Sequence, residues 1–147
     1  MPLPRHFPSF SAARQQFKQV LDSASHDAVT TIQRESEQFL LVRAAAQRED
    51  LATLLPSRAE AVAEGGGWAV LFPGLPLHGD GDTFEEAVDD AIVALREYAD
   101  DWNERLRQYP NHIANRPVVE LVELSDDEQL RSWILGQPAT AELTPTA

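Results

Sequence analysis

The spacing of apolar residues along the chain changes repeatedly between the periods of helices and strands, which predicts an α+β protein. Over residues 10–24, apolar side chains recur every three or four positions and predict one amphipathic helix. A short strand is expected before it, at 7–9. Two apolar runs, 29–32 and 39–42, flank a polar turn and predict a β-hairpin.

A second hairpin is predicted in the middle of the chain. A short helix at about 48–55 precedes it and is stopped by Pro56. Runs at 59–63 and 68–72 flank a glycine-rich turn, which predicts the hairpin. The Pro and Gly residues of 73–82 predict a loop after it.

The strongest local signal is the start of a long amphipathic helix. Thr83 and Glu86 fit a capping box, which satisfies free backbone N–H groups at a helix N-terminus. Apolar residues then recur every three or four positions for roughly 25 residues, up to Pro110. Beyond it, 118–124 is predicted as a strand, and a capping box begun by Ser125 opens a short C-terminal helix.

Charge divides the chain into unequal parts. The net charge is −12, yet residues 1–60 are neutral, while 61–147 carry five Lys or Arg against seventeen Asp or Glu. This asymmetry suggests two surfaces with different partners, although a merely solvated acidic part explains it equally well. We predict three regions, namely a first module at 1–56, an acidic region at 57–136 and a disordered tail at 137–147.

Composition excludes several classes of protein. The chain has no Cys, which excludes disulfides, thiolate metal sites and a Cys nucleophile. No apolar run approaches the ~18–20 residues that span a bilayer. The first residues lack the apolar stretch of a signal peptide, so we expect a cytoplasmic protein.

A short pattern in the first module is carried by 10–17 (Phe-Ser-Ala-Ala-Arg-Gln-Gln-Phe), 28–34 (Ala-Val-Thr-Thr-Ile-Gln-Arg) and 39–42 (Phe-Leu-Leu-Val). It resembles the Phd/YefM (prevent-host-death, RelB-type) antitoxin fold, in the order strand, helix, hairpin, helix. Two departures are a missing turn glycine, where Ser36 is closest, and Arg34, which comes one position later than usual.

The resemblance implies a dimer that presents arginines to operator DNA. It points to Arg14 and Arg34 for DNA binding, with Lys18 as a weaker phosphate contact. The alternative is that these are solvated charges, or partners of Asp22 and Glu37. Because the basic set is small, DNA affinity is expected to need both protomers and to depend strongly on salt.

A second resemblance covers residues 59–106. The segments 66–76 and 81–87 contain a hairpin, a Phe-Pro-x-Leu-Pro loop and a Gly-Asp-Thr-x-x-Glu-Ala helix start, which is similar to the HicB antitoxin pattern. It implies a small sheet packed on the long helix, and toxin neutralisation only by association. The same residues are also explained as core and helix cap.

Partner binding is predicted on the long helix and the C-terminal helix. The polar face of the long helix carries a row of carboxylates, which suits docking of a basic partner. Trp and Leu side chains serve well as anchors in a groove, but those near the C-terminus fit a core equally well. The predicted contacts are Glu97, Asp100, Asp101, Trp102, Leu130, Trp133 and Ile134.

Candidate catalytic and metal chemistry is sparse. His78, Asp80 and Asp82 place three possible metal ligands in one flexible loop, but no second cluster completes a site, so we predict no metal. The carboxylate row lies on a solvated face, where no burial raises a pKa for acid–base work. We therefore predict no enzyme and no cofactor.

These features lead to a functional hypothesis. We interpret the chain as the antitoxin of a type II toxin–antitoxin system that neutralises a small basic toxin, such as a RelE-type RNase, and autorepresses its operon. It is expected to be a homodimer through 1–55, with no membrane partner. A DNA-binding transcriptional regulator without a toxin is the alternative, and an enzyme using the carboxylate row or His78 is a third hypothesis.

Overall fold

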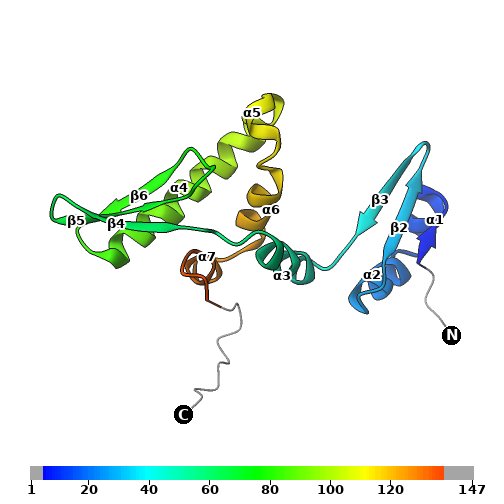
Figure 1. Cartoon of the computed structure of the whole chain (residues 1–147). Helices are drawn as coiled ribbons and strands as arrows, with labels where there is room; N and C mark the ends of the chain where they lie inside the picture. Colours follow the sequence, from blue (N-terminus) through cyan, green and yellow to red (C-terminus); the bar gives the residue numbers. More distant parts are fainter. Residues whose placement is uncertain (1–4, 138–147) are drawn as a thin grey trace, which may run out of the picture. The chain divides into compact units, whose positions relative to one another are not determined.

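The computed structural model describes residues 5–137 and confirms the α+β class (Figure 1). These residues form two compact units that divide between Gln47 and Arg48. The division falls inside a helix, α3 (Ala44–Leu54), and so precedes the boundary predicted after residue 56. Most of the predicted tail, residues 138–147, lies outside the described residues.

The first unit contains a three-stranded sheet. Its central strand β2 (Thr30–Arg34) runs parallel to β1 (His6–Phe7) and antiparallel to β3 (Glu37–Leu41). In this register Ile32 lies opposite Phe39. The first predicted hairpin is therefore confirmed, with a shorter turn than the sequence suggested.

Two helices stand where the sequence predicted one helix over 10–24. They are α1 (Phe10–Gln15) and α2 (Phe17–Ser25), and they join at Gln16, whose φ of −116° and ψ of 34° leave the helical region. Ser9 caps α1 by accepting a hydrogen bond from the Ala12 N–H at 3.0 Å. The helical conformation predicted from the apolar spacing is confirmed, but the spacing continues through Gln16 and so does not indicate the break there.

The core of the first unit is small. Phe7, Ala13 and Val20 are buried in it, and Ile32 and Leu41 pack against them. The buried hydroxyls of Ser23 and Thr30 hydrogen-bond to each other at 2.8 Å, which satisfies two polar groups close to this core.

The second unit contains another antiparallel sheet. Its strands, β4 (Glu60–Glu64), β5 (Gly67–Leu71) and β6 (His78–Gly81), lie in that order. The first two form the second predicted hairpin. The third corrects the prediction of a loop over 73–82, because residues 78–81 pair with β5 along their whole length.

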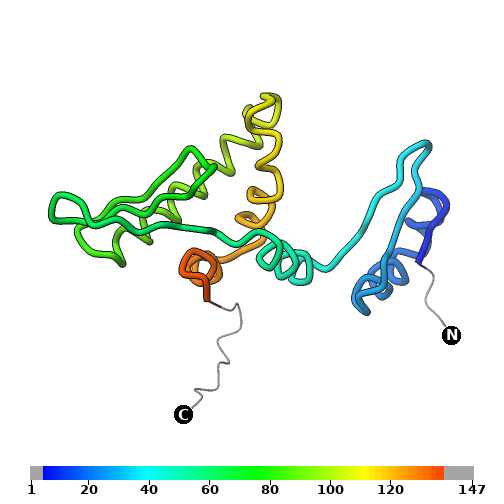
Figure 2. The backbone as a smooth tube through the Cα atoms, viewed as in Figure 1, coloured from blue at the N-terminus to red at the C-terminus, as the bar shows by residue number. Residues whose placement is uncertain are grey.

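One long helix covers a face of this sheet. In Figure 2, α4 (Phe84–Glu104) lies along the sheet, in contact with β5 and β6. Thr83 caps it, as predicted, by accepting a hydrogen bond from the Glu86 N–H at 3.1 Å. The helix ends earlier than expected, and the chain continues through two short helices, η1 (Leu106–Gln108) and α5 (Pro110–Ile113).

The strand predicted at 118–124 is wrong, because these residues form the helix α6 (Arg116–Leu124). Val119, Leu121 and Val122 are buried. Side chains of consecutive strand residues point to opposite faces, whereas positions 119 and 122 lie on one face of a helix, with 121 beside them. The run of Val and Leu satisfies both periods, and packing against α4 selects the helix.

The last helix begins one position later than predicted. Asp126 caps α7 (Asp127–Ile134) by accepting from the Gln129 N–H at 2.7 Å, and the Gln129 side chain accepts from the Asp126 N–H at 2.9 Å. Ser125 instead ends α6, where its hydroxyl donates to the Leu121 carbonyl. Gly136 follows α7 at a φ of 70°, as expected for a residue that ends a helix.

The core of the second unit forms around the apolar face of α4. This face packs against the sheet and against α6 and α7. Arg96 links the same elements, because its guanidinium donates to the Val122 carbonyl, the Ser125 carbonyl and the Asp127 carboxylate at 2.7, 2.8 and 2.9 Å. The α4 residues in the core are Ala87, Val88, Ala91, Ile92, Leu95, Tyr98, Ala99 and Trp102.

The packing of α4 on β6 leaves no room for a side chain at Gly79. A Cβ built there would lie 2.3 Å from the Ala91 nitrogen and 2.5 Å from the Ala87 oxygen, both of which are backbone atoms. Gly81 meets the same helix equally closely. The sequence suggested that these glycines interrupt the chain in a loop. In the structure they lie inside a strand, where they allow the backbone of α4 to approach closely.

We expect Gly79→Ala to lower the free energy of unfolding by at least about 3 kcal/mol, because helix and strand must separate to admit a methyl group. Urea unfolding followed by circular dichroism measures the change. The control is Gly65→Ala, where nothing lies within 4 Å and only the positive φ of 57° opposes Ala, at about 1 kcal/mol. Equal losses for the two variants would contradict this account.

Candidate functional site

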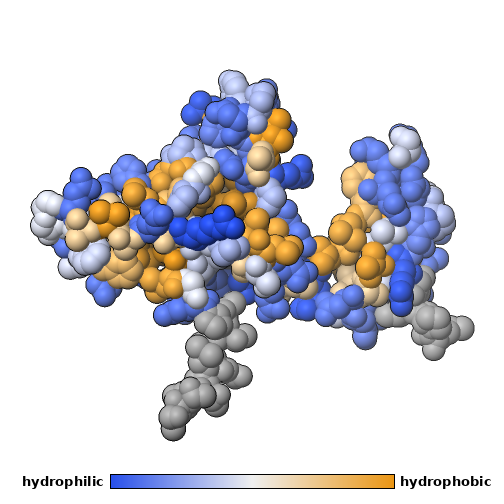
Figure 3. All heavy atoms as spheres, in the orientation of Figure 1, coloured by the Kyte–Doolittle hydropathy of each residue, from blue (hydrophilic) through white to orange (hydrophobic). Residues whose placement is uncertain are grey.

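Many large apolar side chains of the first unit are exposed around its small core. Seven large apolar side chains are between 41% and 68% exposed, and Figure 3 shows apolar surface along its β2–β3 side. This number of exposed apolar groups makes the first unit a candidate for contact with another molecule. They are Phe10, Phe17, Leu21, Val29, Phe39, Leu40 and Val42.

Two of the three predicted DNA-binding residues share one side of α1. The Arg34 guanidinium lies over the Phe10 ring, 5.6 Å from its centroid, in a cation–π contact. Arg14 follows Phe10 by four positions and so lies on the same face of α1. Both arginines are exposed and form no ion pair with a residue of the described range 5–137.

Lys18 has a different environment. It lies on α2, and its Nζ forms an ion pair with the Asp22 carboxylate at 2.9 Å on the solvent-exposed side. This contact agrees with the alternative that the sequence left open, in which Asp22 is the partner of a basic residue. The contact is a surface pair of i,i+4 type, which contributes little stability and opens readily.

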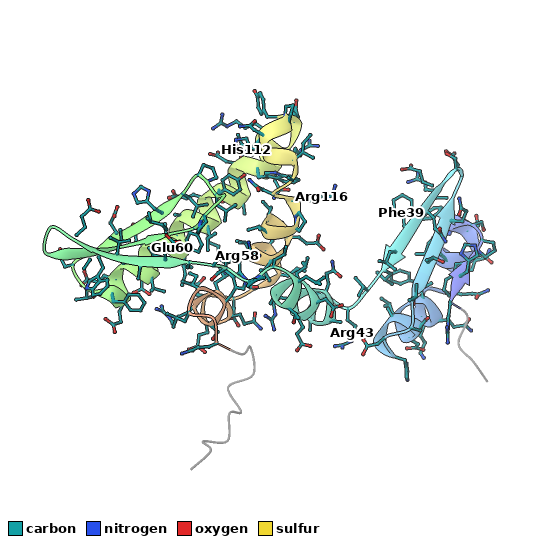
Figure 4. The ribbon with its side chains drawn as sticks, in the orientation of Figure 1. Phe39, Arg43, Arg58, Glu60, His112 and Arg116 are labelled. Atoms are coloured by element: carbon teal, nitrogen blue, oxygen red, sulfur yellow. The ribbon has the colours of Figure 1, made fainter. Side chains whose placement is uncertain are left out.

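A bidentate ion pair joins the segment after β3 to the segment between α2 and β2. The Arg43 guanidinium, which follows β3, donates to both carboxylate oxygens of Asp27 at 2.8 and 3.3 Å (Figure 4). Asp27 itself has a positive φ of 57°. The hydrogen bond from Arg43 holds the pKa of the Asp27 carboxyl below its ordinary value.

The acidic candidates of the second unit lie on the solvent face of α4. Glu97, Asp100 and Asp101 are all exposed. Asp101 pairs with Arg105 at 3.5 Å, whereas Glu97 and Asp100 have no ion pair within residues 5–137. Val93, 52% exposed, lies one helical turn before Glu97 on this face, so an apolar group adjoins the free carboxylates.

The four apolar partner contacts predicted from the sequence are corrected by the structure. Trp102, Leu130, Trp133 and Ile134 are buried in the core of the second unit. The two indole N–H groups are satisfied internally, by the carbonyls of His112 and Leu55 at 2.8 and 2.7 Å. These side chains stabilise the fold and present no anchor on the surface.

A mixed surface that the sequence did not suggest lies on the sheet face turned away from α4. Strand register places Glu60, Val62 and Glu64 on this face, next to Leu71 and Asp80. Val62 and Leu71 are partly exposed between the carboxylates. This face was missed because residues 78–81 were interpreted as a loop, which left the sheet without its third strand.

Residues 5–137 contain neither a metal-binding cluster nor a membrane-spanning helix. His78 Nε2 lies 3.1 Å from the Asp80 carboxylate, but within this range no three His, Asp or Glu side chains converge on one point. None of the helices in this part of the chain is both long and apolar enough to cross a membrane.

Comparison with known proteins gives one family and one similar structure. Residues 6–134 match the PHD_like family, described as the antitoxin of RelE/RelB toxin–antitoxin systems. The fold resembles the crystal structure of the antitoxin part of a proposed toxin/antitoxin system from Syntrophomonas wolfei subsp. wolfei. The two chains are 21% identical, with a TM-score of 0.73 over 88% of this chain and 96% of the other. No curated protein matches the chain.

The Asp27–Arg43 pair predicts a pH-dependent stability. Because the pKa of Asp27 is lowered in the folded state, the pair stabilises the fold fully above the ordinary value of 3.8, and this contribution is lost as pH falls through the lowered pKa. Asp27→Asn, which tolerates the same backbone, is expected to melt below the parent at neutral pH and to approach it in acid.

Thermal unfolding of parent and variant at pH about 7 and about 2.5 measures this difference. The control, Asp50→Asn, removes an exposed carboxyl that has no ion pair within residues 5–137. It should shift the melting temperature equally at both pH values. A constant gap between the parent and Asp27→Asn would refute the prediction.

Proposed function

Because the chain belongs to the PHD_like family of RelE/RelB antitoxins, we propose that it binds and neutralises a small basic toxin and represses its own operon. The family also makes it a non-enzymatic regulatory protein, as the sequence predicted. A RelE-type RNase is the toxin class that we favour, since a protein that binds RNA carries a basic surface. We place this activity in the cytoplasm.

The observation that carries toxin binding is the face of α4 on which Glu97 and Asp100, with no ion pair within residues 5–137, lie beside Val93. Carboxylates without internal partners attract a basic protein over long range and speed its association. The exposed valine gives the contact an apolar part. The sheet face around Val62 and Leu71 has the same mixture and supports a second contact area.

The observation that supports DNA binding is the placement of Arg14 and Arg34 near Phe10, on one side of α1. Guanidinium groups contact phosphates or read guanine in the major groove. Two arginines from one chain are few for specific binding. The exposed apolar residues of the first unit support a homodimer, which doubles the set and suits a symmetric operator.

The alternative function, a transcriptional regulator without a toxin, is favoured by the separation of these features. The DNA-binding candidates all lie in the first unit, and the acidic face lies entirely in the second. DNA binding therefore does not require a toxin. Recovery of a stoichiometric basic partner decides between the two functions.

A tagged pull-down from the native host at moderate salt, followed by mass spectrometry, tests the antitoxin function. We expect a small basic protein in near-stoichiometric amount that is toxic when expressed alone and harmless when expressed with this chain. Recovery of this chain alone would leave the regulator as the better account.

Once the toxin is purified, Glu97→Gln with Asp100→Asn is expected to weaken its binding about tenfold at low salt, by removing two attractive charges. Surface plasmon resonance measures the rates, and the loss should fall mainly on association. The control is Asp50→Asn with Glu128→Gln, which removes two exposed carboxylates outside α4. An equal effect of both pairs would assign the attraction to net charge instead of this face.

For DNA, Arg14→Ala with Arg34→Ala is expected to weaken binding to the chain's own promoter fragment by at least about tenfold and to flatten its salt dependence. Fluorescence anisotropy at two salt concentrations measures both effects. Arg116→Ala removes an exposed arginine of the second unit and is the matched control. Unchanged affinity of the double variant would place the DNA contacts elsewhere.

A further inference from the structure

The second unit contains a cavity of about 650 Å³ between α3 and α7. Residues of α3, of the segment that leads into β4, and of α7 with its end form its walls. We propose that this cavity, named here the α3–α7 cavity, binds a small organic carboxylate through Arg48 and Arg58. The site is separate from the acidic face of α4 and from the arginines of the first unit.

Arg48 is the main reason for this proposal. It is only 6% exposed, yet it forms no hydrogen bond and no ion pair with any residue of the range 5–137. A guanidinium keeps its proton in proteins, so burial cannot neutralise it, and a buried charge without a counter-charge is strongly unfavourable. A bound anion would supply the missing counter-charge.

The guanidinium is reachable from the cavity. Arg48 is part of the cavity wall. In the described part of the chain, no buried side-chain nitrogen or oxygen is both sealed from solvent and without a partner. The unpartnered nitrogens of Arg48 must therefore keep some access, and the cavity provides it.

Arg58 supplies a second, independent observation. It lines the same cavity, has no partner within residues 5–137, and has a φ of 52°, which is unusual for a residue with a side chain (Figure 4). Ser57 holds this segment on α7 by donating to the Ile134 carbonyl at 3.1 Å. Strained backbone that the surrounding structure holds in place is characteristic of binding sites.

The charge of the cavity wall contrasts with the unit around it. The second unit is strongly acidic, and Arg96 and Arg131 are engaged there with Asp127 and Asp89. The cavity wall, in contrast, carries two arginines that have no partner among residues 5–137, and one acidic residue. That residue, Glu49, is exposed and pairs with neither arginine. The wall is thus a positive site within a negative surface, which concentrates small anions.

The rest of the wall defines the ligand class. Ala52, Pro56, Trp133 and Leu135 are apolar, and the volume is typical of cavities that hold small molecules. A planar carboxylate matches the two parallel N–H groups of a guanidinium. A short apolar body would then lie against Trp133, so a medium-chain monocarboxylate fits better than inorganic phosphate, which has no apolar part.

The test is a titration of the ¹⁵N-labelled full chain with hexanoate at constant ionic strength, followed by NMR. The Trp133 indole N–H, hydrogen-bonded to the Leu55 carbonyl at 2.7 Å, reports on the cavity. We expect a saturable shift of its signal with hexanoate, and a much weaker response to hexanamide or inorganic phosphate. An equal response to hexanamide would overturn the role of charge, and an equal response to phosphate would overturn the carboxylate class.

Variants separate binding from folding. Arg48→Met is expected to weaken hexanoate binding about 10- to 100-fold, and to melt at or above the parent temperature without ligand, because an unpaired buried charge is removed. Arg116→Met has the same charge change at an exposed position and should leave binding unaltered. Unchanged affinity of Arg48→Met would overturn the proposal.

Arg58→Gly is a second variant that tests hexanoate binding if Arg48→Met does not fold. Glycine accepts the positive φ, so this variant should be at least as stable as the parent while binding hexanoate several-fold more weakly. A variant with the parent's affinity would exclude Arg58 from the site. A loss of ligand-free stability would instead assign Arg58 a structural role.

Discussion

The close approach of α4 to β6 is the contact on which the second unit depends. Gly79 and Gly81 lie directly under the helix, where a single methyl group would collide with its backbone. Two glycines remove the side-chain layer that normally separates a helix from a sheet. The helix therefore lies close along the strands, and its apolar face is fixed toward Val70 and Phe72.

This position of α4 decides what the unit exposes. With one side against the sheet and another covered by α6 and α7, its remaining side faces solvent and carries Glu97 and Asp100. Arg96 holds the arrangement by donating to carbonyls at the end of α6 and to Asp127 at the start of α7. These two carboxylates, which have no ion pair within residues 5–137, are thus held on a rigid helix, as the proposed recognition of a basic protein requires.

The two units differ in how completely they bury their apolar residues. The second satisfies both of its buried indoles and encloses a large core. The first buries four apolar side chains and exposes seven large ones. The exposed set is the surface that we propose for the homodimer. Within the second unit, the α3–α7 cavity is the exception, since its wall includes the buried Arg48, which has no counter-charge among residues 5–137.

The sequence by itself determined the α+β class, both hairpins, the cap of α4 at Thr83 and the acidic character of that helix, because these depend on neighbouring residues. Only the tertiary structure decided the rest. The run 118–124 fits the periods of strand and helix alike. The local sequence around Gly79 is the same whether this glycine lies in a loop or in a strand under a helix. Trp102 and Trp133 could anchor a partner or fill a core, and the structure buries both in the core of the second unit, where Trp133 stacks on Phe72. Such choices depend on contacts between residues far apart in the chain, which a local pattern does not contain.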